Sequence, residues 1–369
     1  MSINSSHTAK GPLAGLKVVE FAGLGPAPFA CMLLADMGAE VVTIERPGYV
    51  PTGPKDIVGR GRKVIIGDLK NQESLAKIME LIDHADVLIE GYRPGVMERL
   101  GLGPVDLEKR NPKLIYGRMT GWGQDGPLAL AAGHDMNYIS LSGALHAIGQ
   151  EGGPPVPPLN LVGDYGGGSM YLITGILAAL FERQSSGKGQ VIDASITDGA
   201  ISLMSHFFGS LARGELVEKR SSNMLDGGLP YYTIYETSDG QHVSVGPLEP
   251  KFFLELATKL GLSQKMIEAH QKKELWPELR AELTKIFKSN TRQHWAELFN
   301  GSDACVAPVL SMSEIDQHAH IQHRQSLVEL DGVKQPAPAP RFSRTPSKIT
   351  PTELYGSSQI DSLIANWSN

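Results

Sequence analysis

Residues 16–45 run Leu-Lys-Val-Val-Glu-Phe (16–21), Ala-Gly-Leu-Gly-Pro-Ala-Pro (22–28), Phe-Ala-Cys-Met-Leu-Leu-Ala-Asp-Met-Gly (29–38), Ala39 and Glu-Val-Val-Thr-Ile-Glu (40–45). The first and last segments have the length and the valine content of buried strands. The third is a longer apolar run that ends at a glycine, which is typical of a helix and its C-terminal stop. The stretch therefore predicts a strand–helix–strand unit.

The glycine loop of this unit permits two interpretations. Gly23 and Gly25 follow the first strand, and Glu45 lies about 20 residues further on, as in a dinucleotide-binding fingerprint. Pro28 stands where that fingerprint has its third glycine, and Pro26 stiffens the turn. A nicotinamide site is therefore the less favoured alternative.

The same alternation continues along the first half of the chain. We expect strands at 63–67, 85–90 and 114–120, a helix at 72–83, and a long apolar helix at 169–183 that Gly187 ends. Alternating strands and helices predict an α/β fold with an open, mainly parallel sheet that binds its ligand at the carboxyl ends of the strands. Arg46, Arg93 and the 121–126 loop follow such ends.

The pattern changes after about residue 225. Segments 230–236 and 242–245 flank Asp239-Gly240, a strong hairpin signal, and helices are expected at 252–260, 276–287 and 293–299. We predict a large domain over 1–200, completed by 330–369, a linker over 201–224, and a small α+β domain over 225–320.

Charge and composition narrow the function classes. The net charge of −6 makes general binding to nucleic acid or to an anionic membrane unexpected. Five basic residues against one acid between Arg46 and Lys63 indicate either a local seat for phosphates or a solvated loop; they are Arg46, Lys55, Arg60, Arg62 and Lys63.

The cellular compartment is predicted from the cysteines and from the lack of targeting and membrane-spanning segments. Cys31 and Cys305 lie in apolar sequence, which indicates two buried thiols in a reducing compartment. The N-terminus has no apolar core of a signal peptide, and no apolar run approaches the ~18 residues of a membrane span. We expect a cytoplasmic protein.

Two titratable residues lie in the segments richest in chemistry. His134 stands in Ala-Gly-His-Asp-Met-Asn-Tyr (132–138), and Asp164 in Asn-Leu-Val-Gly-Asp-Tyr-Gly-Gly-Gly-Ser (160–169). A histidine can accept a proton near neutrality, and a protonated aspartic acid can supply one. Facing each other across a carbon, they would perform racemisation or epimerisation. A helix-capping role for Asp164 and a structural role for His134 are the alternatives.

Several separated blocks resemble family III CoA-transferases, and within that family the racemases of α-methylacyl-CoA. The opening block is Gly-Pro-Leu-Ala-Gly-Leu-Lys-Val-Val-Glu-Phe (11–21), followed by Leu-Leu-Ala-Asp-Met-Gly-Ala-Glu-Val (33–41). The racemase-like blocks are 133–138, 160–164, 223–228 and 303–309. The similarity spans nearly the whole chain. It implies a Rossmann-like large domain with a small domain, in two chains interlocked as a homodimer.

The resemblance also implies site residues. His134 would be the base and Asp164 its partner, with glycines 166–168 offering N–H groups to an enolate oxygen; Glu249 would pair with His134 from the other chain. The acyl-CoA substrate would contact a larger set, comprising Arg46, Gly67, Asp68, Leu69, Lys70, Gly91, Tyr92, Arg93, Arg99, Gly133, Asp135, Met136, Asn137 and Tyr138. No metal, flavin or nicotinamide is implied, because CoA belongs to the substrate and no redox change occurs.

Two other functions stay open at this point. In a CoA-transferase the Asp164 carboxylate would be a nucleophile, but such a mechanism has no obvious need for His134 and Glu249. A non-catalytic acyl-CoA-binding protein would leave all three residues unexplained.

Overall fold

The computed structural model describes residues 11–356 and 359–368. Residues 1–10, to which the expectation of no signal peptide refers, lie outside this range. The chain divides into two compact units. The first takes in residues 1–144, 158–205 and 320–369 as far as they are described, and the second takes in residues 145–157 and 206–319.

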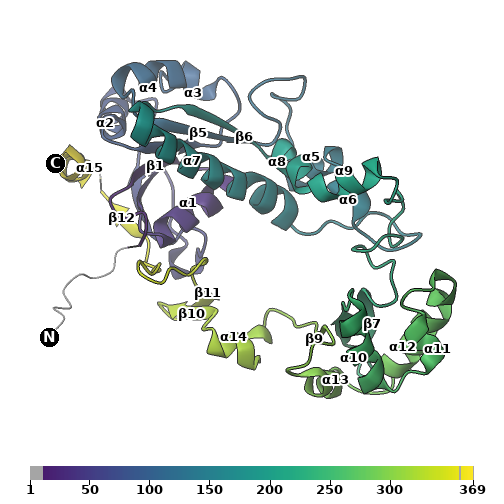
Figure 1. The fold of residues 1–369 in the computed structure, drawn as a ribbon. Helices are drawn as coiled ribbons and strands as arrows, with labels where there is room; N and C mark the ends of the chain where they lie inside the picture. Colours follow the sequence, from purple (N-terminus) through teal and green to yellow (C-terminus); the bar gives the residue numbers. More distant parts are fainter. Residues whose placement is uncertain (1–10, 357–358, 369) are drawn as a thin grey trace. The chain divides into compact units, whose positions relative to one another are not determined.

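A seven-stranded parallel sheet forms the centre of the first unit (Figure 1). Its strands lie in the order β12-β3-β2-β1-β4-β5-β6. They are β1 (Lys17–Phe21), β2 (Glu40–Glu45), β3 (Arg62–Ile66), β4 (Val87–Glu90), β5 (Ile115–Thr120), β6 (Val191–Ser195) and β12 (Glu353–Tyr355). Val18 pairs with Val41 on one side and Val87 on the other. The predicted α/β fold is confirmed, and the strand order reverses between β1 and β4, where doubly wound folds bind ligands.

Helices cover both faces of this sheet. Val18 and Val19, neighbours on β1, belong to cores on opposite faces, as alternation along a strand requires. One core includes α1 (Pro26–Asp36) and α7 (Met170–Ser186). The other includes α2 (Gln72–Asp83), α3 (Val96–Arg99), α4 (Pro104–Arg110) and α15 (Gln359–Ser368).

Local sequence explains where these helices begin. Asn71 caps α2 because its side-chain oxygen accepts a hydrogen bond from Ser74 N at 3.0 Å. Helix α1 begins at Pro26, earlier than the predicted residue 29, since a proline in the first turn has no N–H that would need a partner. The predicted helix 72–83 has the observed bounds.

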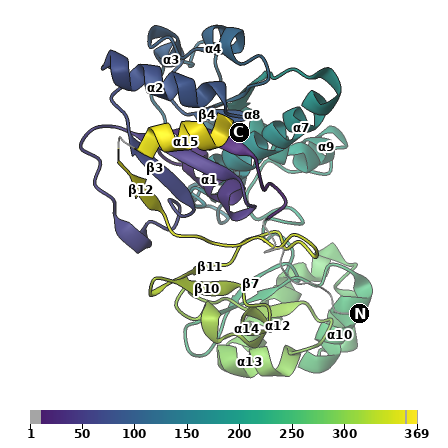
Figure 2. The same ribbon diagram turned by 90° about the vertical axis from the view of Figure 1, so that its left-hand side faces the viewer.

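The C-terminal part of the chain returns to the sheet of the first unit. Strand β12 pairs in parallel with β3 at the sheet edge, as Figure 2 shows in yellow. Before it comes a hairpin of β10 (Leu327–Leu330) and β11 (Val333–Pro336). Arg60 ties this hairpin down by donating to Gln335 Oε1 and Pro336 O, both at 2.8 Å. Shorter helical elements along the chain are η1 (Gly53–Lys55) in the first unit, η4 (Ile315–Gln317) in the second, and α14 (Ala319–His323) where the chain passes from the second unit to the first.

The second unit is built from an antiparallel sheet and helices. The sheet has the order β7-β8-β9, with β7 (Thr233–Glu236), β8 (His242–Val245) and β9 (Val306–Pro308). Its helices are α10 (Pro250–Leu260), α11 (Gln264–Glu268), η3 (Lys273–Leu275), α12 (Trp276–Phe287) and α13 (Arg292–Phe299). Strands and helices share one core that contains Val243, Phe253, Leu283 and Phe287. The hairpin turns at Gly240 in the left-handed region, as the Asp-Gly signal indicated.

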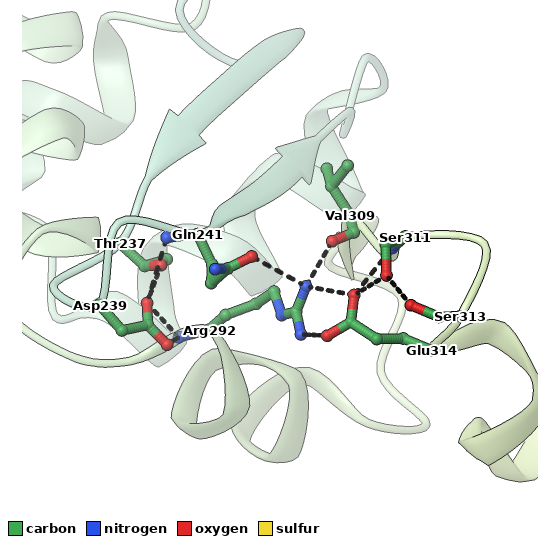
Figure 3. Close-up of polar contacts among 8 residues, drawn as sticks. All are labelled: Thr237, Asp239, Gln241, Arg292, Val309, Ser311, Ser313 and Glu314. Carbon is green, nitrogen blue, oxygen red and sulfur yellow. Dashed lines mark hydrogen bonds and ion pairs between the residues drawn. The ribbon is translucent and has the colours of Figure 1, made fainter.

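An ion-pair cluster fastens α13 to this hairpin (Figure 3). Arg292 binds Glu314 through its guanidinium and also donates to Val309 O at 2.7 Å. The backbone N–H of Arg292 donates to the carboxylate of Asp239. The guanidinium and the N–H and hydroxyl groups of Ser311 lower the pKa of Glu314 to about 2.

Three details differ from the sequence predictions. Residues 145–157, predicted to lie in the large domain, group with the second unit because Arg220 donates to His146 O and Gly153 O. The predicted linker contains the end of α8 (Ile196–Leu203) and all of α9 (Ser205–Ala212). Cys305 was expected to be buried and is exposed, at a residue with φ of 52°.

Within the described part of the chain, no helix combines the length and apolarity needed to cross a membrane.

Candidate active site

His134 stands at the start of a short helix in the first unit. Helix α5 (Asp135–Leu141) begins immediately after it, and Asn137 Oδ1 accepts a hydrogen bond from His134 N at 3.0 Å. Tyr138 donates its hydroxyl to Gly133 O, so the peptide group between Gly133 and His134 is held at both its N–H and its carbonyl oxygen. The His134 side chain is exposed, which leaves the imidazole accessible to a substrate.

Asp164 belongs to an unusual helical segment. Residues Leu161–Ser169 form a π-helix, η2, that continues into α7. π-Helical turns are rare and are frequent at functional sites. The segment packs closely on α8, since a Cβ on Gly199 would lie 1.9 Å from Gly167 O. Asp164 is therefore not the helix cap that its sequence position also allowed, because Asn160 occupies the cap.

One carboxylate joins the two helices. Asp135 Oδ1 accepts a hydrogen bond from Asp164 N at 2.7 Å, and the carboxylate also accepts from the N–H of Gly163. Gly163 must be a glycine for this approach, because a Cβ there would lie 2.2 Å from Asp135 Oδ1. The residue that follows His134 thus holds the backbone of Asp164.

The surroundings of Asp164 favour its protonated form. Partial burial raises the pKa of Asp164, and the charge of Asp135 raises it further; a hydrogen bond from Asn160 and the charge of His134 act in the opposite direction. Gly25, at φ 72°, makes room for this carboxyl, since a Cβ there would lie 2.9 Å from Asp164 Oδ2. The glycine that suggested a dinucleotide loop instead lies against Asp164.

The glycines after Asp164 have a packing role. A Cβ on Gly167 would lie 2.7 Å from Ala200 N, and one on Gly168 would lie 3.0 Å from Pro26 Cβ. As residues of a π-helix, they direct their N–H groups to carbonyl groups five residues earlier. The prediction that the N–H groups of 166–168 serve an enolate oxygen is therefore wrong.

A depression of about 510 Å³ lies where the strand order reverses. It is lined by residues at or just after the ends of β1, β2 and β4, namely Ala22, Gly23, Leu24, Glu45, Arg46, Gly48, Tyr49, Val50 and Tyr92. Arg46 offers an exposed guanidinium and Tyr92 a half-buried ring. Both were predicted CoA contacts, and the structure brings them together.

A buried ion-pair network supports this rim. Glu90, the last residue of β4, is fully buried and accepts from Arg118 Nε at 2.9 Å. Its other oxygen accepts from Tyr92 N at 2.7 Å, and Arg118 also binds Glu98. The Gly91-Tyr92-Arg93 turn is thereby anchored. On α5, burial and the charge of Asp164 raise the pKa of Tyr138, and the charge of Arg93 acts in the opposite direction.

The other predicted CoA contacts are more dispersed. Gly67 and Asp68 line a separate depression beside α2, and Leu69 packs against the core. Lys70 is exposed, and its N–H donates to Asp68 Oδ1. Arg99, Met136 and Asn137 are exposed.

Residues 13–353 match the sequence model of a protein family described as CoA-transferase family III. The chain belongs to this family. It is 44% identical to alpha-methylacyl-CoA racemase of Mus musculus and 42% identical to that of Homo sapiens, in each case over 91% of this chain and 87% of the relative. A CAIB/BAIF family protein from Brucella suis has the same fold, with a TM-score of 0.78 and 25% identity over 97% of this chain and all of that one.

Family membership confirms the resemblance inferred from the sequence blocks, and it implies an acyl-CoA ligand. The basic stretch 46–63 has fewer cations free for phosphate groups than its composition suggested. Arg60 pairs with buried Asp36, Arg62 with buried Glu20, and Lys63 with Glu40, so three of its five cations are neutralised by acids.

Glu249, the family's expected histidine partner, lies in the second unit. It is exposed and stands at the N-cap of α10, where its side chain makes no capping hydrogen bond. Its charge acts on the exposed residue Cys305, whose thiol pKa is raised first by partial desolvation and then by Glu249.

Three residues that contribute to the site were not recognised as such from the sequence. Gly25 was considered only as part of a phosphate loop, Asn160 was not considered, and Asp135 was assigned to CoA alone. The only sequence signal for Asp135 was its position next to His134, because its partners are backbone groups 28 and 29 residues away. Within the described ranges, no cluster of three or more His, Cys, Asp or Glu side chains is arranged to hold a metal ion.

Proposed function

We propose that this protein interconverts (R)- and (S)-2-methylacyl-CoA thioesters by removing and returning the α proton through an enolate. The observation that carries the proposal is the convergence of His134 and Asp164 on neighbouring helices whose backbones one carboxylate, Asp135, links. The names of the two racemase relatives supply the substrate class.

His134 and Asp164 can take opposite roles, acceptor and donor, as a proton transfer on two faces of one carbon requires. His134 is exposed at the start of α5, where a neutral imidazole can accept a proton. Burial and the charge of Asp135 raise the pKa of Asp164 and favour a carboxyl group that can donate one. An acid and a base of this kind, on opposite faces of one carbon, are what inversion requires.

The proton transfers balance without a cofactor. In one direction the imidazole of His134 takes the α proton, the C–H electron pair moves into the enolate, and the Asp164 carboxyl group protonates the other face. In the reverse direction the Asp164 carboxylate takes the proton and the imidazolium of His134 returns it. The N–H groups of Asp135 and Met136, in the first turn of α5, precede any intrahelical acceptor, and we assign the enolate oxygen to them.

CoA itself would occupy the rim where the strand order reverses. Arg46 suits the phosphate groups, and Tyr92 suits the adenine ring. Arg93 directly follows Tyr92 of that rim, and its charge acts on Tyr138 of α5. No metal, flavin or nicotinamide enters this proposal, because the reaction moves a proton and leaves the oxidation state of the substrate unchanged.

CoA transfer is the second candidate function. Its Asp164 would have to act as an ionised nucleophile that forms an anhydride with the acyl group. The raised pKa of Asp164 works against that ionised state and in favour of a proton donor. The family includes transferases, so the two functions need a direct test.

The remaining parts of the proposal concern assembly and location. We place Glu249 beside His134 of a second chain in an interlocked homodimer. The carboxylate of Glu249 makes no capping hydrogen bond to the first turn of α10, so it is available to pair with an imidazole. A carboxylate partner would fix the tautomer of the imidazole and raise its basicity. We place the protein in the cytoplasm, where two unpaired thiols remain reduced.

Incubation of each enantiomer of a 2-methylacyl-CoA in deuterated water tests the proposal. Racemisation predicts deuterium at the α carbon and loss of stereochemical purity with no second acid added. Retention of configuration, together with exchange of CoA onto an added free acid, would establish transfer instead.

A further inference from the structure

We propose that Asp135 is a positioning residue for the reaction: its carboxylate clamps the backbone of η2 to the start of α5 and so sets the placement of Asp164 relative to His134. This inference rests on the proposed racemase function and gives Asp135 a role beyond contact with CoA.

The geometry of the clamp is specific. Asp135 Oδ1 lies 2.7 Å from Asp164 N, and the same carboxylate accepts the N–H of Gly163. Both N–H groups come from the first turn of η2, where a helix has no acceptor of its own for them. Asp135, the residue after His134, therefore accepts from two N–H groups of η2, the segment that carries Asp164.

The surroundings leave the carboxylate little freedom. Gly163 is buried, and a Cβ on it would lie 2.2 Å from Asp135 Oδ1 and 3.0 Å from Ile139 Cγ2. Any side chain at residue 163 would expel the carboxylate. An acid that served only to bind CoA would need neither this glycine nor these two backbone donors.

The clamp also contributes charge to Asp164, which permits a second test. His134, which precedes α5, and Asp135 and Tyr138 on α5 interact electrostatically with Asp164; Asn160, the N-cap of η2, donates a hydrogen bond to it. Helix α1 contributes Gly25 and has no acid in its first turn. Among these groups, Asp135 is the one whose charge raises the pKa of Asp164.

Two substitutions separate position from charge. Asp135→Asn keeps the Oδ1 acceptor and removes the charge, whereas Asp135→Ala removes both. We expect Asp135→Ala to lower kcat for racemisation by about 10²-fold, the scale of a misplacement of about 1 Å, with KM for acyl-CoA nearly unchanged. Asp135→Asn should keep most of kcat and shift the part of the pH–rate profile that reports Asp164 to lower pH.

Further variants guard against loss of folding. Gly163→Ala, which expels the carboxylate while leaving Asp135 in place, should reproduce the kcat loss of Asp135→Ala. Asp106→Ala is the matched control, because Asp106 is an exposed acid in the first turn of α4, another seven-residue helix. Its kinetics should equal those of the parent. Circular dichroism melts of all variants show whether each is folded.

The outcomes distinguish the clamp from the proposed function. If the parent enzyme does not racemise 2-methylacyl-CoA, both proposals are overturned. If the parent racemises and Asp135→Ala or Gly163→Ala retains the parental kcat, the clamp alone is overturned. Equal large losses in Asp135→Asn and Asp135→Ala would also overturn it, because charge and not position would then be the essential contribution.

Discussion

Replacing Gly25 with alanine should damage catalysis through Asp164 without touching the predicted CoA contacts. Gly25 precedes α1 with φ of 72° and ψ of −115°, a combination that suits glycine alone. Alanine there costs about 1–3 kcal/mol in backbone strain. Its Cβ would lie 2.9 Å from Asp164 Oδ2 and 3.4 Å from Cγ, closer to Oδ2 than ordinary contacts allow.

The size of the effect follows from these distances. Relief of the contact moves the Asp164 carboxyl group by several tenths of an ångström, and a misplacement of about 1 Å can lower a rate by about 10²-fold. We therefore expect a loss of about 10- to 100-fold in kcat with little change in KM. The assay is the rate at which a single enantiomer of 2-methylacyl-CoA loses optical purity, followed by chiral chromatography of the hydrolysed acid.

Gly15→Ala is the control for backbone strain. Gly15 has φ of 91° and is exposed, and a Cβ added to it would have no atom within 4 Å. The Gly15→Ala variant should lose stability as Gly25→Ala does, but it should keep the parental racemisation rate. Parental kcat in Gly25→Ala, or an equal loss in Gly15→Ala, would refute the proposed contact between residue 25 and the catalytic carboxyl group.

Three further outcomes are expected. Arg60→Met should lower the free energy of unfolding by about 3–5 kcal/mol in urea titrations, because it leaves the buried Asp36 carboxylate unpaired; a change below about 1 kcal/mol would contradict this. Stability contributed by Glu314 should persist above its ordinary pKa of about 4.3 and disappear as pH falls through about 2, since Arg292 and its neighbours lower that pKa. Thermal melts from pH 5 to pH 2 should therefore be flatter for Glu314→Gln than for the parent, and parallel curves would exclude the linkage. Glu249→Gln should reduce racemisation by less than loss of the base itself, and sedimentation at nanomolar concentration should show dimers; a folded, active monomer would remove the proposed role of Glu249.

The parallel sheet could be predicted from the sequence because strands buried on both faces read as short valine- and isoleucine-rich runs. Residues 16–21 and 40–45 are of this kind, and β1 and β2 lie within them. Strand β12 could not be predicted in the same way. It has three residues and pairs with β3 across nearly 300 residues of sequence, so no local pattern marks it.

The candidate site was predictable only in part. His134 and Asp164 could be identified by residue type and glycine context, but Asp135 acts through backbone groups of a distant segment and leaves no spacing pattern. Burial also changed the interpretation of charge. Arg60 and Arg62 look like phosphate ligands in sequence, yet both are buried against acids, which a count of charges does not reveal.

The central claim is that His134 and Asp164 serve opposite faces of one carbon. It is tested most directly by α-proton exchange of each enantiomer in deuterated water with His134→Ala and Asp164→Ala. Each variant should lose about 10²–10⁴-fold in racemisation and still bind acyl-CoA, because the predicted CoA contacts lie elsewhere. Each should exchange the α proton of only one enantiomer, and the two variants should select opposite enantiomers. Parental racemisation by His134→Ala, with CoA transfer abolished in Asp164→Ala, would contradict the account.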